Sequence, residues 1–180
     1  ITDTHYFASS LGCSGAEYDD FMHYEQKCFA ETEAINNAVF DFLGNTDKTD
    51  TILIAGDLSF NGEKESHLGF IKLLKKLQDN GKRVFVITAG HDFNDYCGGY
   101  TDAGIHEVEH TDRDELFDLY YEFGFKDAIA VDKKHLSYVA QLTPQIRLLA
   151  LNNDGTEDCR ETYDEEQLEW IKEQIRDAKA

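Results

Sequence analysis

The stretch from Ile52 to Glu63 constrains the fold of this chain more than any other. Its first four residues, Ile-Leu-Ile-Ala, form a continuous apolar run that ends at Gly56 and Asp57, and a helical pattern follows. Such a run is typical of a strand that is buried on both faces of a parallel sheet. The glycine allows a tight turn and leaves the carboxylate of Asp57 at the tip of the strand.

Two other stretches have the same design. The chain opens with a strand end that carries Asp3 and His5, and the apolar run 84–87 leads to His91 and Asp92. In open α/β sheets, binding sites lie outside the carboxyl ends of the strands. We therefore expect these three strand tips to meet and to form one site.

The alternation of elements predicts an α/β fold with a mainly parallel first sheet. Residues 50–55 and 82–88 have the composition of strands, and residues 20–43 and 63–80 have helical periodicity. Short links between strand, helix and strand predict right-handed crossovers between parallel strands.

The first predicted helix carries one apolar stripe at three- and four-residue spacing, which is typical of the core-facing side of a helix. The stripe consists of Phe29, Ile35, Ala38, Val39, Phe42 and Leu43. The start of a further helix, after the one over residues 63–80, is predicted at Thr111 and Asp114, which resemble a capping box.

The other segments are less regular. Residues 7–20 and 94–111 lack periodicity and are predicted to be loops. Residues 135–142 and 145–151 have strand composition on either side of Thr143 and Pro144, so we expect a hairpin there. The acidic residues from Asp164 onward predict the start of a last helix.

Composition excludes several classes of function. The 180 residues are 41% hydrophobic and predict one globular domain over residues 1–180. The formal net charge of -19, with 36 acidic against 17 basic residues, disfavours general nucleic-acid binding. The sequence contains no apolar run of the roughly 20 residues that a membrane span needs.

The four cysteines do not indicate a clustered zinc site. Cys13, Cys28, Cys97 and Cys159 are far apart and form no C-x-x-C pair. An even number of cysteines permits two disulfides, but free thiols are equally compatible with a chain of this length, so both remain open.

The residues at the three tips are suited to metal chemistry. Asp3 and His5 are two residues apart, so in an extended chain both side chains project to the same face and can share a zinc, iron or manganese ion. The two oxygens of Asp57 can bridge two cations, and a cation pair can bind a phosphoryl group. His91 can protonate a leaving oxygen, and the neighbouring Asp92 can hold its tautomer. Singly, each motif is also compatible with an ordinary turn or surface dipeptide.

The order of these motifs resembles the calcineurin-like metallophosphoesterase family, over the whole chain. The family shows D-x-H, then G-D-x-x, then G-N-H-D, each after a strand, and here these are residues 3–5, 56–59 and 89–92. Residues 56–67, 136–151 and Gln167-x-x-Trp170 resemble a bacterial branch that is secreted or associated with the cell envelope, and this resemblance favours such a localisation over the cytoplasm. The resemblance implies an αββα sandwich. It also implies that Asp3, His5 and Asp57 bind the first metal, that Asp57 bridges to the second, and that His91 is the proton donor.

The chain departs from the family pattern in two ways. The asparagine of G-N-H-D, which binds the second metal in the family, is Gly90 here, so water, a backbone oxygen, Asn94 or Asp95 would have to substitute. The family also supplies histidines from strands beyond the Q-x-x-W helix, whereas this chain ends at Ala180. We therefore expect a C-terminally truncated domain with incomplete metal shells, and poor activity for these residues alone.

Two other histidine signals are weighed against this interpretation. Residues His106 to His110 match H-E-x-x-H, but a zinc protease needs that motif on a helix, and Gly104 and the predicted helix start at Thr111 leave no room for one. A polar loop is favoured. His67, on the helix after Asp57, could contact the rim of the site or could be an ordinary helix-surface or capping histidine.

The sequence therefore predicts a metal-dependent hydrolase that acts on a small phosphorylated substrate, with two divalent cations of the iron, zinc or manganese class. Because of Gly90, two alternatives stay open. One is a non-catalytic member that binds a ligand or partner, and the other is an enzyme with a single metal ion. The oligomeric state is not predicted.

Overall fold

Two parallel strands form the centre of the molecule. β1 (Thr51–Ala55) pairs with β2 (Arg83–Ile87) in register from Thr51 opposite Arg83 to Ala55 opposite Ile87. The helix α3 (Lys64–Asp79) connects them, as predicted for a crossover. The first residues of the chain run parallel to β1, with isolated bridges from Thr2 to Ala55 and from Tyr6 to Ser59.

This computed structural model describes residues 1–25, 27–93, 96–154 and 162–179. The remaining elements follow along the chain. They are η1 (Ser9–Leu11), α1 (Ala16–Tyr24), η2 (Phe29–Glu31), α2 (Thr32–Asn45), η3 (Gly90–Phe93), β3 (Gly98–Thr101), β4 (Gly104–Glu107), α4 (Arg113–Leu119), η4 (Tyr121–Phe123), η5 (Phe125–Asp127), β5 (Ala128–Asp132), β6 (Ser137–Thr143), β7 (Ile146–Ala150) and α5 (Glu165–Asp177).

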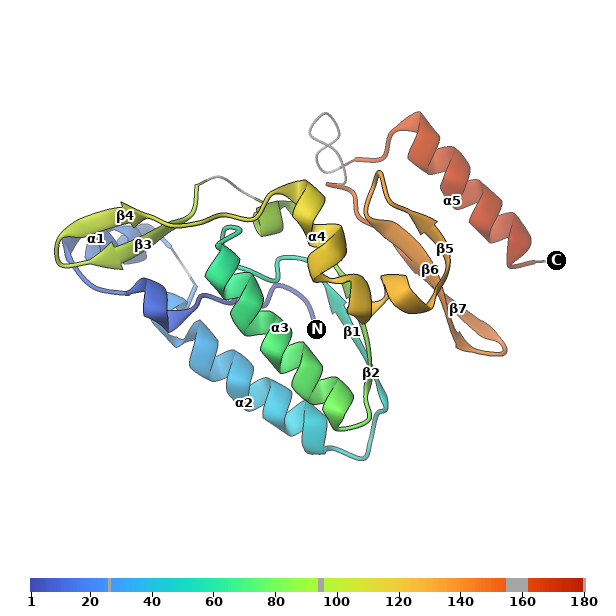
Figure 1. Cartoon of the computed structure of the whole chain (residues 1–180), viewed down its shortest axis with the longest axis horizontal. Coiled ribbons are helices and arrows are strands. Elements are labelled where there is room, and N and C mark those ends of the chain that lie inside the picture. Colours follow the sequence, from blue (N-terminus) through green and yellow to red (C-terminus); the bar gives the residue numbers. More distant parts are fainter. Residues whose placement is uncertain (26, 94–95, 155–161, 180) are drawn as a thin grey trace.

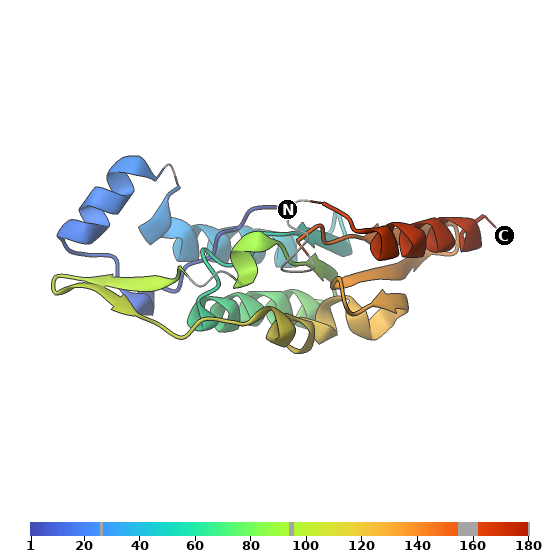
Figure 2. The ribbon, with the colours of Figure 1, turned by 90° about the horizontal axis from the view of Figure 1, so that it is seen from above.

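The molecule is elongated and thin. The β3–β4 hairpin and α1 lie at one end, and the β5–β6–β7 sheet and α5 lie at the other (Figures 1 and 2). The α/β class is confirmed, but the expected stacking of two sheets into an αββα sandwich is not seen among the described residues. These residues form three small sheets, of two, two and three strands.

The core lies mainly between α3 and the central strands. On the predicted apolar side of α3, Phe70, Leu74 and Leu77 are completely buried, but Leu68 is 46% exposed. Lys72, Lys75 and Lys76 face water, as predicted. The apolar run of β1 suggested a strand that is buried on both faces. The structure shows instead that its residues alternate between buried and exposed. Ile52 and Ile54 are buried, whereas Leu53 is 41% exposed.

The helix predicted over residues 20–43 is two helices, and the loop predicted over 7–20 contains η1 and the start of α1. The cause is aromatic packing. The ring centroids of Phe21 and Phe29 are 5.6 Å apart, and Phe29 also lies 4.4 Å from Phe60. In one continuous helix, eight residues would separate the two positions by about 12 Å along the axis. The chain therefore leaves the helix after Tyr24 and resumes it at Thr32.

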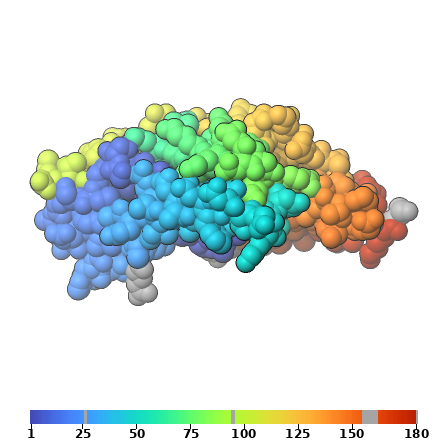
Figure 3. Space-filling view, turned by 90° about the horizontal axis from the view of Figure 1, so that it is seen from below, coloured from blue at the N-terminus to red at the C-terminus, as the bar shows by residue number. Residues whose placement is uncertain are grey.

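The buried face of α2 is not the predicted apolar stripe. It consists of Thr32, Asn36, Phe40 and Gly44, whereas Ile35, Val39 and Phe42 of the stripe are exposed. The polar members bond the N-terminal segment, since Thr32 Oγ1 accepts from the Phe7 amide at 3.0 Å and Asn36 donates to the Thr4 carbonyl at 3.1 Å. The outer surface of α2, in light blue, lies across the face shown in Figure 3.

The segment predicted as a loop over 94–111 contains the antiparallel β3–β4 hairpin. His106 and Glu107 belong to β4, so the H-E-x-x-H residues are not on a helix, as expected. The capping box before α4 is one residue later than predicted. Asp112 accepts from the backbone of Glu115, and the side chain of Glu115 accepts from the backbone of Asp112.

The C-terminal part contains the predicted β6–β7 hairpin and an additional strand, β5, which the sequence did not indicate. The hydroxyl of the fully buried Tyr138 in β6 donates to the Val86 carbonyl of β2 at 2.9 Å. α5 begins as predicted, with Asp164 accepting from the Gln167 amide. The buried His135, between Asp132 and Asp164, connects this helix to β5.

No helix in the described part of the chain combines the length and apolar character that crossing a bilayer requires. Cys13 and Cys28 are free thiols. Cys159, Asn94 and Asp95 lie outside the described residues.

The contact between Tyr138 and Val86 gives a first prediction. Tyr138→Phe leaves a buried carbonyl without its donor, so we expect the free energy of unfolding to fall by about 1 kcal/mol. Denaturant unfolding measures this change. Tyr121→Phe, at a residue that is 42% exposed, is the control and should change stability by less than about 0.5 kcal/mol. Equal effects of the two substitutions would contradict the role of the Tyr138 hydroxyl.

Candidate metal centre

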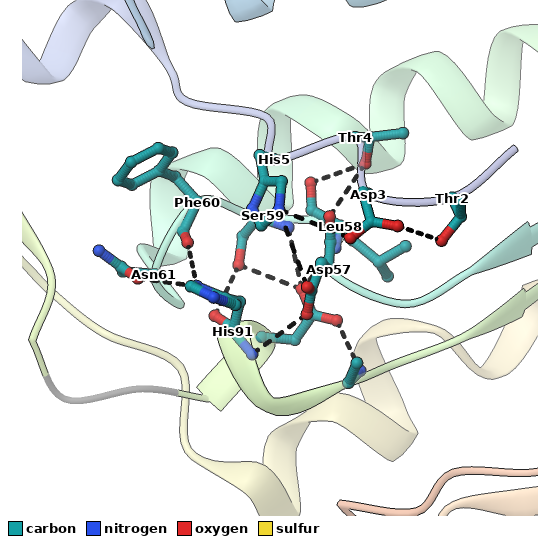
Figure 4. A network of polar contacts seen from close by, with 12 residues as sticks. Thr2, Asp3, Thr4, His5, Asp57, Leu58, Ser59, Phe60, Asn61 and His91 are labelled. Carbon is teal, nitrogen blue, oxygen red and sulfur yellow. Dashed lines mark hydrogen bonds and ion pairs between the residues drawn. The ribbon is translucent and has the colours of Figure 1, made fainter. Parts of the chain in front are cut away.

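The three predicted strand tips meet. The backbone amide of Asp3 donates to the Gly56 carbonyl at 3.2 Å, and the amide of His5 donates to the Asp57 carbonyl at 2.9 Å. On the other side of β1, the Gly56 amide donates to Ile87 of β2 at 2.9 Å. Each tip is thus registered on its neighbour by continuation of the parallel ladder. Figure 4 shows Asp3, His5, Asp57 and His91 near one another at these tips.

Gly56 is required where β1 ends. Its φ is +71°, and a Cβ added there would lie 2.7 Å from the Cβ of Ala89. Such a distance is too short for two carbon atoms, so any side chain at position 56 would push the tips of β1 and β2 apart. This observation confirms the turn role predicted for the glycine before Asp57.

Asp3, His5 and Asp57 form a compact group of candidate ligands. One ligand atom from each lies within 4.8 Å of the others. His5 Nε2 is 3.8 Å from Asp3 Oδ1 and 3.7 Å from Asp57 Oδ2. These distances are too long for direct hydrogen bonds. A cation held by all three side chains would fit the donor set, because carboxylate oxygen with imidazole nitrogen suits zinc, iron or manganese.

The imidazole of His5 is suited to binding a cation. The residue is 8% exposed, and its Nδ1 is buried without a hydrogen-bond partner among the described residues. Burial, together with the nearby charge of Lys27, lowers the pKa of His5. The ring is therefore kept neutral, which is the form that binds a metal ion.

The backbone at these three residues is strained. Among the described residues other than glycine, only Asp3, His5, Asp57 and Leu136 have positive φ, at 53°, 39°, 49° and 51°. Each such conformation costs on the order of 1 kcal/mol, and strain of this kind clusters at functional sites. Three of the four strained residues are the candidate ligands.

His91 lies beside this group. Its ring is 4.9 Å from the ring of His5, edge to face. Its Nδ1 lies 2.8 Å from the Phe60 carbonyl and 2.9 Å from Asn61 Oδ1. The carbonyl can only accept, so Nδ1 carries the proton and donates, which leaves Nε2 available for proton exchange.

The sequence suggested that Asp92 holds the tautomer of His91, but the structure shows a different role for Asp92. Its carboxylate is fully buried, with Oδ1 accepting from the amides of Leu58 and Ser59 at 2.8 and 2.9 Å, and Oδ2 accepting from the Ala89 amide at 2.9 Å. Burial raises the pKa of Asp92 to about 7, against the opposing effect of these amide donors. The residue joins the tips of β1 and β2, and Phe60 and Asn61 orient His91 in its place.

His67 is neither a rim residue nor a surface histidine. It is completely buried on α3, with Nε2 2.8 Å from the Asp92 carbonyl and Nδ1 2.6 Å from the Tyr120 hydroxyl. The carbonyl accepts, so Nε2 carries the proton and Nδ1 accepts from Tyr120. Burial lowers the pKa of His67 to about 4. A neutral imidazole therefore holds the backbone that follows His91.

Sequence reasoning missed two residues that border the strand tips, Asn61 and Asp154. Asn61 is two residues beyond the Gly-Asp-x-x motif and carried no signal for a role at His91. Asp154 follows the apolar strand β7 at the end of an Asn-Asn-Asp run, the same strand-then-polar design as the other tips. The structure places its carboxylate beside Gly90, where a Cβ added to the glycine would lie 3.5 Å from Asp154 Oδ2.

The buried His67 generates a prediction on pH. Above pH 6.5 its imidazole is neutral in both the folded and the unfolded chain. Between pH 6.5 and 4 only the unfolded chain binds the proton, so the free energy of unfolding falls by about 1.4 kcal/mol per pH unit.

His67→Gln removes this titration and keeps a donor toward the Asp92 carbonyl. We expect denaturant unfolding between pH 7.5 and 5 to show a shallower loss of stability in this variant than in the wild type. His23→Gln, at an exposed position, is the control. Parallel pH profiles for the wild type and His67→Gln would contradict a neutral buried imidazole.

The family model for calcineurin-like phosphoesterases matches residues 1–180. No curated protein matches the chain. The order of the three tips, the group of Asp3, His5 and Asp57, and this match over the full length agree with one another. The chain belongs to the calcineurin-like phosphoesterase family.

Proposed function

We propose that this chain hydrolyses phosphate esters, diesters or monoesters of a small molecule, with two divalent cations at the three strand tips. The observation that carries the proposal is the group of Asp3, His5 and Asp57, within 4.8 Å of one another, beside the ring of His91. Family membership supports a metal-dependent phosphoesterase in general.

Asp3, His5 and Asp57 would hold the first cation, and Asp57 would reach the second with its other oxygen. When bound, cations of the iron, zinc or manganese class would neutralise the charge of the phosphoryl group and make water a nucleophile at neutral pH. The strained backbone of the three residues supports this role, because it aims their side chains before any substrate arrives.

His91 would protonate the leaving oxygen. Its Nδ1 keeps its proton on the Phe60 carbonyl, so Nε2 is the atom that gains and loses a proton. When the ester bond to phosphorus breaks, the departing oxygen takes the Nε2 proton, and a neutral imidazole remains. Asp92 and His67 support this step only by holding the backbone around His91.

A positive charge beside the site supports an anionic substrate despite the net charge of -19. Lys27 is close enough to His5 to lower its pKa, and its Nζ lies 5.1 Å from the centroid of the Phe60 ring. We infer that Lys27 attracts the phosphate of the substrate to the strand tips. An extended polyanion would be repelled by the rest of the surface, so a small phosphorylated molecule is favoured.

Gly90 keeps two alternatives in view. A non-catalytic member would bind a ligand or partner through the same tips, and an enzyme with one metal ion would use Asp3, His5 and Asp57 alone. The metal content and the turnover of the wild type distinguish these two readings from the proposed function.

The test uses the full-length protein, loaded with manganese, and two phosphodiesters. His91→Asn should lower kcat by about 10²–10³-fold for a diester with an alkyl leaving group. The loss should be smaller for bis(4-nitrophenyl) phosphate, because nitrophenolate leaves readily without a proton. Bound manganese per chain should not change.

His23→Asn, at an exposed position, is the matched control and should keep wild-type turnover. Equal losses for the two leaving groups would contradict proton donation by His91. A wild type without bound metal and without turnover would exclude the enzyme and favour the binding protein.

Lys27→Met tests the proposed attraction of the phosphate. We expect KM for a phosphate ester to rise about 3–10-fold with kcat nearly unchanged, because the lysine acts on binding more than on the chemical step. The effect should shrink as the salt concentration increases. Lys48→Met, on the exposed segment before β1, is the control. An unchanged KM at low salt would contradict the role of Lys27.

A further inference from the structure

We propose that Glu63 is a positioning residue for His91. Its buried carboxylate holds the turn over residues 60–62, and this turn fixes the ring of His91 with its proton on Nδ1. The effect on catalysis rests on the proposed function, whereas the orientation of the ring is measured without turnover.

The first step is the pair of contacts that orients the ring of His91. Its Nδ1 lies 2.8 Å from the Phe60 carbonyl and 2.9 Å from Asn61 Oδ1 (Figure 4). The two oxygens belong to adjacent residues of one turn, between β1 and α3. The backbone of this turn therefore decides where the ring points and which of its nitrogens carries the proton.

The second step is that a buried carboxylate accepts the donors of this turn. Glu63 is 1% exposed, and its Oε2 accepts from the Asn61 amide at 3.2 Å. The carboxylate also accepts from the amide of Glu63 itself and from the Ser66 hydroxyl. Ser66, which is fully buried, accepts in turn from the Ala8 amide at 3.1 Å. The turn is thus bonded through Glu63 to α3 and to the N-terminal segment.

The third step separates this role from that of a helix cap. Glu63 is the N-cap residue of α3, yet within the described part of the chain its side chain accepts no capping hydrogen bond from the backbone of that helix. It turns back to Asn61 instead. Burial raises the pKa of Glu63, so a charge at this position costs free energy that its donors must offset. A carboxylate offers only acceptors, and each partner named above is a donor, so the side chain matches the turn.

The fourth step is that the rest of the turn is held elsewhere. Gly62 has a φ of +84°, which glycine adopts without strain, and its amide donates to Ser59 Oγ at 3.0 Å. Ser59 Oγ also lies 3.2 Å from Asp92 Oδ1, so this end of the turn is fixed to the strand tips. Asn61 is anchored through its amide by Glu63. Loss of this acceptor should therefore move Asn61 more than the rest of the turn.

The first experiment measures the tautomer of His91 by nitrogen NMR of the histidine rings. It uses the metal-free full-length protein at about pH 8, where an imidazole of ordinary pKa is neutral. The signals that disappear in His91→Asn identify the residue. We expect a proton on Nδ1 in the wild type and a mixture of the two tautomers in Glu63→Gln, because glutamine turns an NH2 group toward the donors of the turn.

Glu65→Gln is the matched control, because Glu65 is an exposed carboxylate in the first turn of the same helix. It should leave the signals of His91 unchanged. Ser66→Ala removes one donor of the Glu63 carboxylate and keeps its charge, so it should shift the tautomer in the same direction by less. This variant tests the proposal if circular dichroism shows that Glu63→Gln does not fold.

The second experiment compares the two leaving groups with the manganese-loaded protein. Glu63→Gln should lower kcat by about 5–30-fold for the diester with an alkyl leaving group and by less for bis(4-nitrophenyl) phosphate, with bound manganese unchanged. In a His91→Asn background, Glu63→Gln should change kcat by less than about twofold, because Glu63 acts only through His91.

An unchanged tautomer of His91 in the folded variants would overturn the proposal, whatever their turnover. Equal losses for the two leaving groups, or a full further loss in the double variant, would also overturn it, because a turn that only stabilised the fold would give these results. A wild type that binds no manganese and has no turnover would reject the proposed function, and the NMR signals would still decide whether Glu63 orients His91.

Discussion

The buried carboxylate of Asp92 is the interaction on which the candidate site depends. It accepts from the amides of Leu58 and Ser59 just beyond β1 and from the amide of Ala89 just beyond β2. A buried carboxylate is costly unless its oxygens are satisfied, so the two tips cannot separate without leaving a charge or a proton donor unpaired. Asp57 and His91 each lie next to an anchored residue, and both are positioned as a consequence. His67 adds a bond to the Asp92 carbonyl from α3.

The location of the site could be predicted from the sequence, but the division of roles could not. Apolar runs specify strands, and parallel strands end at one edge, so Asp57 and His91 were expected to meet. The adjacency of His91 and Asp92 in sequence suggested contact between their side chains. The 3-10 turn η3 instead directs Asp92 into the core and leaves His91 half-buried beside His5. The partners of His91, Phe60 and Asn61, come from a turn 30 residues earlier, and local sequence gives no signal for such a contact.

The helices illustrate the same limit. The bounds of α3 were predicted almost to the residue, because most of its apolar residues pack in the core and most of its lysines face water. For α2, the wrong face was predicted to be buried. The reason is that hydrophobic periodicity does not reveal which backbone groups need hydrogen-bond partners. The segment around Thr4 and Phe7 runs beside β1 without a full ladder, and buried backbone groups must be paired. Thr32 and Asn36 supply those bonds, so a polar row faces inward and Ile35 and Phe42 face outward.

Strain and charge at the strand tips lead to the same conclusion as the motifs do. Three residues with positive φ, each a candidate ligand, raise the free energy of the folded chain, and neighbouring carboxylates raise it further. A fold that needed only stability would lose both features by substitution. A divalent cation held by Asp3, His5 and Asp57 would reverse the balance, because it would turn the repulsion between the Asp3 and Asp57 carboxylates into shared attraction. The bonds from the amides beyond β1 and β2 to Asp92 hold the strand tips together, and we infer that they hold the site for a cation that the chain itself does not supply.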